Sequence, residues 1–322
     1  MARVQRPEHF ESSEGHFFQN EPGLVELIEA FDLRLVNKGT NLLIMVPNPE
    51  LYDGEIPFCL KYVTFDQKPL DSRLQRLVLQ GIKNQRSLEG KASVQRVFKD
   101  GFYLGIPGLL QLEFVQGQTW LERYKTGQGV DGAGYTPEHA YVDARAIYDH
   151  IVRPMNKEGV IHRDIKPANV IFRKGDDIPV GIDLSLAVTY QQHRTQPRAG
   201  TIAYVSDNHT HFHHVDPVAL GISMVQAAYA YLETDAIRGG LFKGALPFDL
   251  RAAFVGEQRD FLDYLLEQGK HDPAVEHLGV PRRYLPVVAR RRDVDLAEFD
   301  TVPTPLLVPG IAETYVGIGP AN

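Results

Sequence analysis

The stretch "HRDIKPANVIFRKGDDIPVGIDLS" (residues 162–185) decides the fold of this chain. Its runs "NVIF" and "PVGID" have the apolar and β-branched composition of short strands, and "RKGDD" between them is typical of a turn. A hairpin centred on Asp176 would set Asn169 and Asp183 directly opposite each other, about 4.5–5.5 Å apart. We therefore expect a buried hairpin that carries polar side chains at its open end.

These polar side chains suggest one kind of chemistry. An amide oxygen from Asn169 and a carboxylate from Asp183 are the oxygen ligands that Mg²⁺ prefers. Asp164 and Lys166 are two residues apart, so in an extended loop they face the same way. A carboxylate to orient a hydroxyl, a cation to neutralise phosphoryl charge and two metal ligands together indicate a phosphoryl-transfer site.

The segment "HRDIKPAN" resembles the catalytic loop of eukaryotic-type protein kinases, with the family's His-Arg-Asp, Lys and Asn at the family's spacing. The resemblance implies an α+β, bilobal protein-kinase-like fold, with a strand-rich N-lobe containing one main helix and a helical C-lobe. It also implies that Asp164 orients the acceptor hydroxyl and that Lys166 neutralises the moving phosphoryl group. Asn169 and Asp183 would hold Mg²⁺.

Other segments follow in the family's order, and they imply an ATP site. "FCLK" resembles the family's Val-Ala-Ile-Lys strand, so Lys61 would contact the α- and β-phosphates. "LQLEFVQG" resembles the hinge beside the adenine. There, Leu112 would be the gatekeeper, and Glu113 and Val115 would offer a backbone carbonyl and N–H group.

Two segments that follow the catalytic loop in the sequence also resemble the family. "GTIAY" (200–204) resembles the segment that holds the substrate site, and it includes Thr201. "DPVALG" resembles the start of the buried helix, where Asp216 would brace the backbone of the loop that begins with His162 and Arg163. Lys166 together with Thr201 resembles the serine/threonine-specific branch.

Arg163 before the catalytic Asp often accompanies regulation by phosphorylation in this family. The candidate acceptors are Thr189, Tyr190 and Thr195, although ordinary loop residues are the preferred interpretation. The segment between Asp183 and Thr201 is short, which is also compatible with activity without phosphorylation.

The N-terminal half departs from the family's pattern. The loop that covers the phosphates is glycine-rich in the family because backbone N–H groups must approach closely. Here "VNKGTN" has only Gly39, and Lys38 either contacts the phosphates or is a solvated turn lysine. The helix over 71–90 should supply a Glu for Lys61. Glu89 is the only carboxylate in the helix body, and Gln80 is the alternative by spacing.

The C-terminal half departs as well. Leu184 and Ser185 follow the metal-binding Asp where the family has Phe and Gly, and "SDN" (206–208) replaces Ala-Pro-Glu. Glu276 stands where the family has the Arg that pairs with that Glu, so both partners are replaced together. Four histidines between 209 and 214 are interpreted as an exposed polar loop, with metal binding or a pH-sensitive surface as alternatives.

Composition limits the partners. The chain has 322 residues, 43% hydrophobic and 23% charged, with a net charge of −7. An acidic chain is not expected to bind nucleic acid or an anionic membrane surface. No apolar run approaches the ~20 residues of a membrane span. The single cysteine, Cys59, excludes an internal disulfide and favours a reducing, cytoplasmic compartment.

Periodicity and turn residues predict four segments. They are an N-terminal extension (1–29), an N-lobe (30–116), a C-lobe (117–290) and a proline-containing tail (291–322). Strands are expected in 33–48, 56–65, 93–106 and 109–115. Helices are expected over 71–90, over 135–159 with Thr136 as N-cap and Pro137 following it, over 216–234 and over 256–272.

We therefore expect an ATP- and Mg²⁺-dependent protein kinase that transfers the γ-phosphate to Ser or Thr hydroxyls of a protein substrate, itself included. Two alternatives stay open. The sparse glycines favour a pseudokinase that binds nucleotide and acts as a regulatory or scaffold module. The altered "SDN" segment leaves room for a kinase of a small-molecule hydroxyl.

Overall fold

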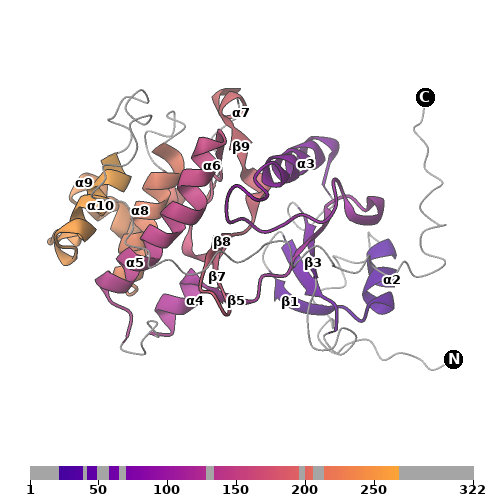
Figure 1. The fold of residues 1–322 in the computed structure, drawn as a ribbon, viewed down its shortest axis with the longest axis horizontal. Coiled ribbons are helices and arrows are strands. Elements are labelled where there is room, and N and C mark those ends of the chain that lie inside the picture. Colours follow the sequence, from indigo (N-terminus) through magenta and orange to yellow (C-terminus); the bar gives the residue numbers. More distant parts are fainter. Residues whose placement is uncertain are drawn as a thin grey trace. The chain divides into compact units, whose positions relative to one another are not determined.

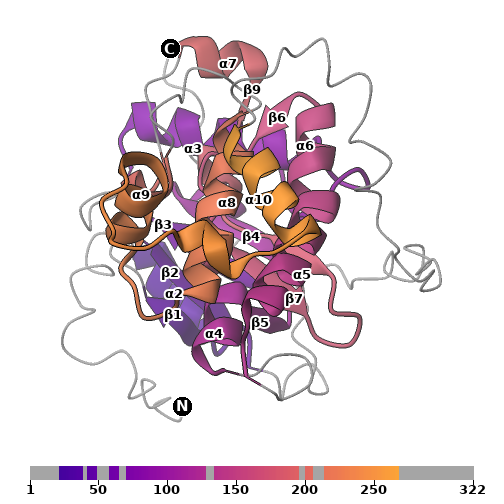
Figure 2. The same cartoon turned by 90° about the vertical axis from the view of Figure 1, so that its left-hand side faces the viewer.

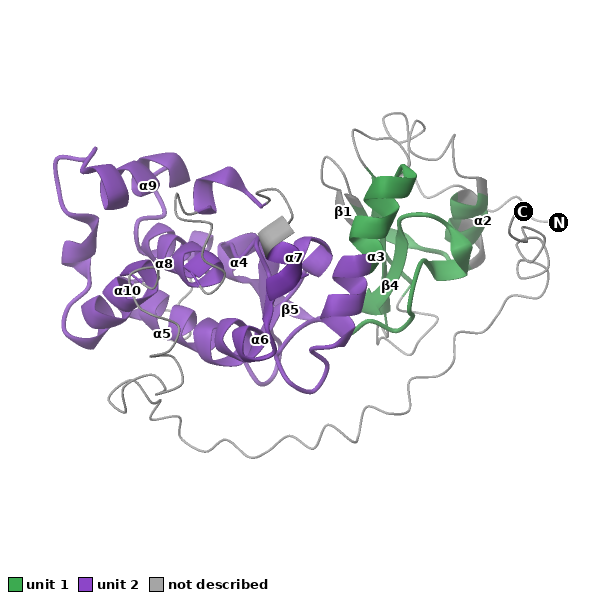
Figure 3. Cartoon of the chain, turned by 90° about the horizontal axis from the view of Figure 1, so that it is seen from above, with its two compact units in different colours: residues 1–79, 96–114, 288–322 green, residues 80–95, 115–287 purple. Residues whose placement is uncertain are grey.

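The computed structural model describes residues 22–38, 42–48, 58–64, 70–127, 134–195, 200–205 and 214–267. It is a mixed α+β structure in which an N-terminal antiparallel sheet is followed by helices (Figure 1). Two compact units can be distinguished (Figure 3). Unit 1 comprises residues 1–79, 96–114 and 288–322, and unit 2 comprises 80–95 and 115–287.

Unit 1 is built on one four-stranded sheet with the order β1-β2-β3-β4. Its strands are all antiparallel to their neighbours: β1 (Arg34–Lys38), β2 (Leu42–Val46), β3 (Phe58–Val63) and β4 (Leu109–Glu113). The predicted pair of strands in 33–48 and the strands near 56–65 and 109–115 are thus confirmed.

The core of unit 1 includes a helix that the sequence analysis assigned to an extension. Helix α2 (Pro22–Ala30) buries Leu24, Leu27 and Ile28 in the same apolar cluster as Met45 and Leu60 of the sheet. The spacing of 24, 27 and 28 is that of one helix face. Prolines and charges nearby obscured this signal in the sequence.

Helix α3 (Ser72–Arg86) begins where the sequence predicted it. The Asp71 carboxylate accepts hydrogen bonds from the N–H groups of Arg73 and Leu74, both at 2.8 Å, and so caps the helix. The helix ends at Arg86, before the predicted end at Gly90. Its residues up to 79 belong to unit 1 and its residues from 80 onward to unit 2.

Unit 2 is mainly helical. Its helices are α4 (Trp120–Lys125), α5 (Pro137–Ile147), α6 (Arg153–Lys157), α7 (Tyr190–Thr195), α8 (Val215–Ala228), α9 (Thr234–Lys243) and α10 (Glu257–Glu267), with a π-helical turn at Tyr148–Val152. Its strands are β5 (Gly117–Thr119), β6 (Val160–Ile161), β7 (Val170–Arg173), β8 (Pro179–Gly181) and β9 (Val188–Thr189).

The predicted helices of unit 2 are confirmed, with shorter bounds. Thr136 caps α5 by accepting from the N–H of His139, and Pro137 follows it at the first helical position. Helix α8 is buried over almost its whole length and packs against both α5 and α10 (Figures 1 and 2). Helix α9 was not predicted, because its "IRGGLFK" run has no extended apolar pattern.

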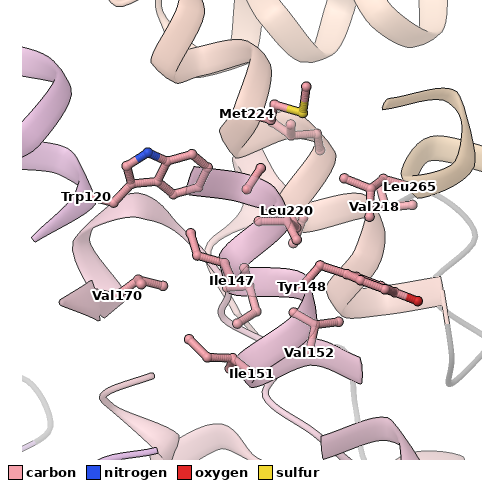
Figure 4. Close-up of a cluster of buried hydrophobic side chains, with 14 of the residues drawn as sticks. Trp120, Ile147, Tyr148, Ile151, Val152, Val170, Val218, Leu220, Met224 and Leu265 are labelled. Atoms are coloured by element: carbon pink, nitrogen blue, oxygen red, sulfur yellow. The ribbon is translucent and has the colours of Figure 1, made fainter. Parts of the chain in front are cut away.

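The core of unit 2 joins these helices to the hairpin strand β7. Trp120, Ile147, Val170, Leu220 and Leu265 are fully buried in one cluster (Figure 4). Fully burying a Leu or Ile side chain stabilises a fold by about 1.5–3 kcal/mol. The hairpin that carries the polar residues is therefore anchored in the largest apolar core of the described residues.

The predicted hairpin is present, but its register differs from the expected one. Strands β7 and β8 pair Val170 with Gly181 and Ile171 with Val180, so Asn169 lies opposite Ile182. The N–H of Ile182 accordingly donates to the carbonyl of Asn169 at 3.0 Å. Direct opposition of Asn169 and Asp183 was therefore wrong by one residue.

The predicted strand over 93–106 was also wrong. This segment forms only single bridges, from Val94 to Gly181 and from Val97 to Leu112. Residues 93–95 belong to unit 2 and residues 96–106 to unit 1. Leu104 and two glycines in this segment adopt positive φ, which interrupts an extended strand.

Within the ranges that the structure describes, no helix combines the length and the apolarity needed to cross a membrane.

Candidate active site

Three residues of the predicted catalytic loop and substrate segment donate hydrogen bonds to one carboxylate, that of Asp164. Asp164 is buried, with 9% of its side chain exposed. Its Oδ2 accepts from Lys166 Nζ at 2.7 Å and from Asn169 Nδ2 at 2.8 Å. Its Oδ1 accepts from the N–H of Thr201 at 2.8 Å and from the Thr201 hydroxyl at 2.7 Å. We call Asp164, Lys166, Asn169 and Thr201 the Asp164 cluster.

This cluster keeps its carboxylate ionised. Burial by itself raises the pKa of Asp164. The hydrogen bonds from Lys166 and Thr201 and the positive charge of Lys166 outweigh that effect and hold the pKa below its usual value. Lys166 Nζ also donates to the Thr201 hydroxyl at 2.8 Å. Carboxylate, ammonium and hydroxyl thus form a closed triangle of charge-assisted hydrogen bonds.

A second carboxylate, that of Asp216, holds the backbone of the loop that carries Asp164. Asp216, near the start of α8, is fully buried and accepts from the backbone N–H groups of His162 at 2.7 Å and Arg163 at 2.9 Å. Burial raises the pKa of Asp216, against the opposing effect of these contacts. Arg163 has a φ of +68°, a conformation that costs energy for a non-glycine residue. The two bonds match the bracing role expected for Asp216.

His162 connects the loop to the hairpin. Its ring Nε2 lies 2.9 Å from the carbonyl oxygen of Ile182, to which it donates, and the residue is fully buried. The loop, the hairpin and the start of α8 are thereby joined by backbone and side-chain hydrogen bonds within unit 2.

The substrate segment approaches the loop closely because it contains a glycine. Gly200 has a φ of +108°, and a Cβ on it would lie 2.1 Å from the carbonyl oxygen of Arg163. No side chain fits there. Gly200 therefore lets Thr201 reach Asp164, a structural role that the sequence analysis did not identify, because it noted the residue only as part of "GTIAY".

Asp183 follows β8 in a left-handed conformation, with φ 60° and ψ 56°. The Ser185 hydroxyl donates to its Oδ1 at 2.8 Å. The extended alternation of side chains ends at this residue, so the hairpin register alone does not fix its direction. Ser185 was noted in the sequence as a departure from the family; its contact with the carboxylate could not be foreseen.

Asn169 and Asp183 have the donor chemistry that suits a hard divalent cation. Both hydrogen bonds of Asn169 use its Nδ2, to the carbonyl and Oδ2 of Asp164, which leaves the amide oxygen for a metal. Together with the Asp183 carboxylate this provides two oxygen ligands, and Mg²⁺ usually takes its remaining ligands from water and phosphate. Among the described residues, no group of three or more His, Cys, Asp or Glu side chains forms a protein-only metal site.

The predicted nucleotide residues lie mainly in unit 1. Lys61 is buried in β3, between Ile44 and Leu110 on the neighbouring strands. Leu112 is buried in β4, and Glu113 ends that strand. The Cys59 thiol lies 3.5 Å from the carbonyl oxygen of Glu113, the group predicted to face the adenine. Val115 is buried in unit 2.

The other nucleotide candidates are less well described. Gly39 lies outside the described residues, and of Lys38 only the backbone is described, at the end of β1. Glu89 lies beyond the end of α3, in the turn that follows Arg86, so it is not in the helix body. Gln80 donates instead to Asn84 Oδ1 at 3.2 Å.

Some of the remaining predicted residues are not among those that the structure describes. "SDN", Glu276 and the histidines of 209–213 are not among the described residues. His214 is described and is buried just before α8, so it does not belong to an exposed polar loop. Of the candidate acceptors, Thr189 pairs with Val160 and Tyr190 is half exposed, while the side chain of Thr195 is not described.

Compared with known proteins, the chain matches no protein-family model, and no curated protein sequence matches it. What the Asp164 cluster does is therefore inferred from its own residues and their geometry.

Proposed function

We propose that this chain is a protein-kinase-like phosphotransferase that transfers the γ-phosphoryl group of ATP to a Ser or Thr hydroxyl of a protein. One observation carries the proposal. A buried carboxylate, Asp164, is kept ionised by Lys166 and accepts a hydrogen bond from an aliphatic hydroxyl, that of Thr201. A substrate hydroxyl has the same chemistry as the group that Asp164 already binds.

The proposed step is an in-line displacement at phosphorus. The substrate hydroxyl oxygen forms a bond to the γ-phosphorus, and the bond from that phosphorus to the β,γ-bridging oxygen breaks. ADP leaves with the electron pair, and the hydroxyl proton passes to Asp164. The Lys166 ammonium, 2.7 Å from Asp164, offsets the negative charge of the transferred group.

The lowered pKa of Asp164 defines its role further. A carboxylate with a low pKa is a weak base, so it orients the hydroxyl before transfer and takes the proton late, once the oxygen has bonded to phosphorus. The hydrogen bonds from Asn169 and Thr201 fix the direction of the Asp164 carboxylate. A substrate hydroxyl bound to it would therefore be held in an orientation suited to reaction.

In this proposal, Asn169 and Asp183 hold Mg²⁺, which when bound neutralises phosphate charge. Ser185 orients the Asp183 carboxylate through its hydrogen bond. Lys61, a cation buried in a strand, is assigned to the phosphates of the nucleotide, as its resemblance to the family's strand lysine suggests.

The test is transfer from labelled ATP in the presence of Mg²⁺, to the chain itself and to generic protein substrates. Wild type is compared with Asp164→Asn, which keeps the shape of the side chain. We expect Asp164→Asn to lower the initial rate by about 10³-fold, because general-base and orienting carboxylates contribute 10²–10⁴-fold. The matched control is Asp263→Asn, a partly exposed carboxylate of α10 bonded to Arg251, which should transfer at the wild-type rate.

Two results would overturn the proposal. The first is equal transfer by wild type and Asp164→Asn. The second is absence of transfer by the wild type while ATP with Mg²⁺ raises its melting temperature. That second result would favour the pseudokinase alternative. Transfer to a small hydroxylic metabolite but to no protein would instead favour the small-molecule alternative.

A further inference from the structure

We infer that Asn84 of helix α3 is a positioning residue. Its side-chain amide holds the segment that follows Asp183 in place by neutral hydrogen bonds, so the segment keeps its conformation without phosphorylation. The inference rests on the proposed function only for its effect on catalysis. Asn84, Ala187 and Gln192 are here called the amide latch.

The latch consists of buried, uncharged groups. Asn84 is 5% exposed, and its Nδ2 donates to the carbonyl of Ala187 at 2.8 Å and to Oε1 of Gln192 at 3.0 Å. The same Oε1 accepts from the backbone N–H of Thr189 at 2.8 Å. One amide of α3 therefore fixes both the turn after Asp183 and the start of α7.

A glycine allows α3 to come this close. A Cβ on Gly81, one turn before Asn84, would lie 2.7 Å from the carbonyl oxygen of Ser185 and 2.8 Å from that of Leu184. The helix backbone thus packs directly on the residues next to Asp183. Since Ser185 also bonds to the Asp183 carboxylate at 2.8 Å, movement of this segment would move the proposed metal ligand.

The opposite side of the segment is tied to the catalytic loop. Arg163 Nε donates to the carbonyl of Leu186 at 2.6 Å, and Ile161 pairs with Val188 between β6 and β9. The segment from Leu184 to Gln192 is therefore held between α3 and the loop that carries Asp164. Asp183, in its left-handed conformation, needs such support because that backbone state is unfavourable for a non-glycine residue.

The latch explains how a short segment can be ordered in the unmodified chain. Its donors and acceptors are amides and backbone carbonyls, which carry no charge at any working pH. A phosphate is not needed to supply the contacts that Asn84 and Gln192 already make. We therefore expect the segment to be equally ordered before and after the protein is treated with phosphatase.

Amide hydrogen exchange on the full chain, after phosphatase treatment, tests the inference directly. Asn84→Ala and Gln192→Ala should each speed exchange across Leu186–Gln192 by about tenfold, since each variant loses two hydrogen bonds that hold this segment. Gln192→Glu should exchange as wild type does, because both bonds of the latch to residue 192 are accepted by an oxygen that Glu retains. Lys83→Ala, exposed on the same helix, is the matched control.

Catalysis supplies the second readout. Asn84→Ala should lower kcat by about tenfold and leave the KM for ATP within about twofold, as expected for a lost positioning contact. Gln192→Ala should lower kcat similarly, whereas Gln192→Glu should keep the wild-type kcat. Asp164→Asn, by contrast, should lower the rate of transfer by about 10³-fold and leave exchange in Leu186–Gln192 unchanged.

The outcomes of the two proposals are distinct. Wild-type exchange rates in Asn84→Ala, or slow exchange that appears only in phosphorylated protein, would overturn the latch whatever the activity. A wild type that transfers no phosphate would remove the proposed function, and exchange alone would then decide whether Asn84 holds the segment.

Discussion

Two buried carboxylates of unit 2, Asp164 and Asp143, have pKa values shifted in opposite directions although each lies beside a cation. Asp143 belongs to a group that we call the Arg123 cluster, formed by Trp120, Arg123, Tyr135, Asp143 and Asp177. Arg123 Nε lies 3.2 Å from Asp143 Oδ2, and its two terminal nitrogens donate to the Asp177 carboxylate at 2.6 and 3.0 Å.

Further contacts hold the buried residues of the Arg123 cluster together, while Asp177 is half exposed. The Arg123 guanidinium lies over the Phe172 ring, 4.3 Å from its centroid. The Tyr135 hydroxyl donates to Asp143 at 2.8 Å and accepts from the Trp120 indole N–H at 2.6 Å. Burial nevertheless raises the pKa of Asp143 to about 6, because Arg123 is shared with Asp177 and only partly offsets the desolvation.

The opposite pKa shifts show what keeps a buried carboxylate ionised. Asp164 accepts four hydrogen bonds, one of them from the Lys166 ammonium, so its pKa falls in spite of burial. Asp143 has two contacts, with the Tyr135 hydroxyl and with Arg123, and Arg123 also pairs with Asp177, so the effect of burial on its pKa prevails. The first arrangement suits chemistry on a substrate, and the second suits a structural link between α4, α5 and the β7–β8 turn.

Of the changes that compare the two clusters, removing the cation of the Asp164 cluster should have the largest effect on catalysis. Lys166→Met should lower kcat/KM by about 10²–10³-fold, the usual effect of deleting one electrostatic stabiliser. It should also raise the pKa of Asp164, because Lys166 opposes the effect of burial. The acid limb of the pH–rate profile should then move to higher pH. An unmoved acid limb would mean that Lys166 does not control this carboxylate.

Removing the cation of the Arg123 cluster should affect stability and not chemistry. Arg123→Met leaves Asp143 buried without its counter-charge, which typically costs about 3–5 kcal/mol. Urea unfolding monitored by circular dichroism would measure this. Arg251→Met, which breaks a partly exposed pair with Asp263, is the control and should change the free energy of unfolding by less than about 1 kcal/mol.

The raised pKa of Asp143 predicts a pH-dependent stability. The folded protein binds this proton more tightly than the unfolded chain, whose ordinary pKa is 3.8, so stability should fall as pH rises from about 4 to 6. The loss is on the order of 3 kcal/mol and is complete above pH 6. Asp143→Asn should remove this slope. If both proteins show the same slope in urea titrations at each pH, Asp143 is not its source.

A smaller effect on stability is expected from Gly→Ala changes at one glycine beside each cluster. Gly200, beside Thr201, and Gly175, in the β7–β8 turn beside Asp177, have nearly equal φ values of +108° and +106°. A Cβ on Gly200 would meet the carbonyl of Arg163, whereas a Cβ on Gly175 would meet no atom within 4 Å. Gly175→Ala should cost about 1 kcal/mol from backbone strain alone, and Gly200→Ala about 1–2 kcal/mol more, with lost activity. Equal unfolding free energies would contradict the close approach.

Much of the Asp164 cluster was predictable because its residues are close in sequence. Asp164, Lys166 and Asn169 lie within six residues, so local loop geometry brings them together, and the hairpin was signalled by "NVIF" and "PVGID". The register of β7 and β8 could not be predicted by assuming a hairpin centred on Asp176. The turn has left-handed residues at Gly175 and Asp177, and these shift the centre of the hairpin by half a residue.

Contacts between residues far apart in sequence could not be predicted. Asn84 and Ala187 carry no charge, and no spacing rule connects a helix amide with a distant backbone carbonyl. The Arg123 cluster likewise joins positions spread from 120 to 177. Gly81 and Gly200 resemble any other glycine in the sequence, and only the neighbouring carbonyls show why no side chain fits.

The chain also carries its own chemical probe of unfolding. Cys59, its only cysteine, is 4% exposed in β3, and burial raises its pKa to about 12. Alkylating reagents attack the thiolate, which is nearly absent in this environment. Labelling of the native chain by iodoacetamide therefore proceeds when the sheet of unit 1 opens, so its rate measures the opening of that unit without any introduced dye or mutation.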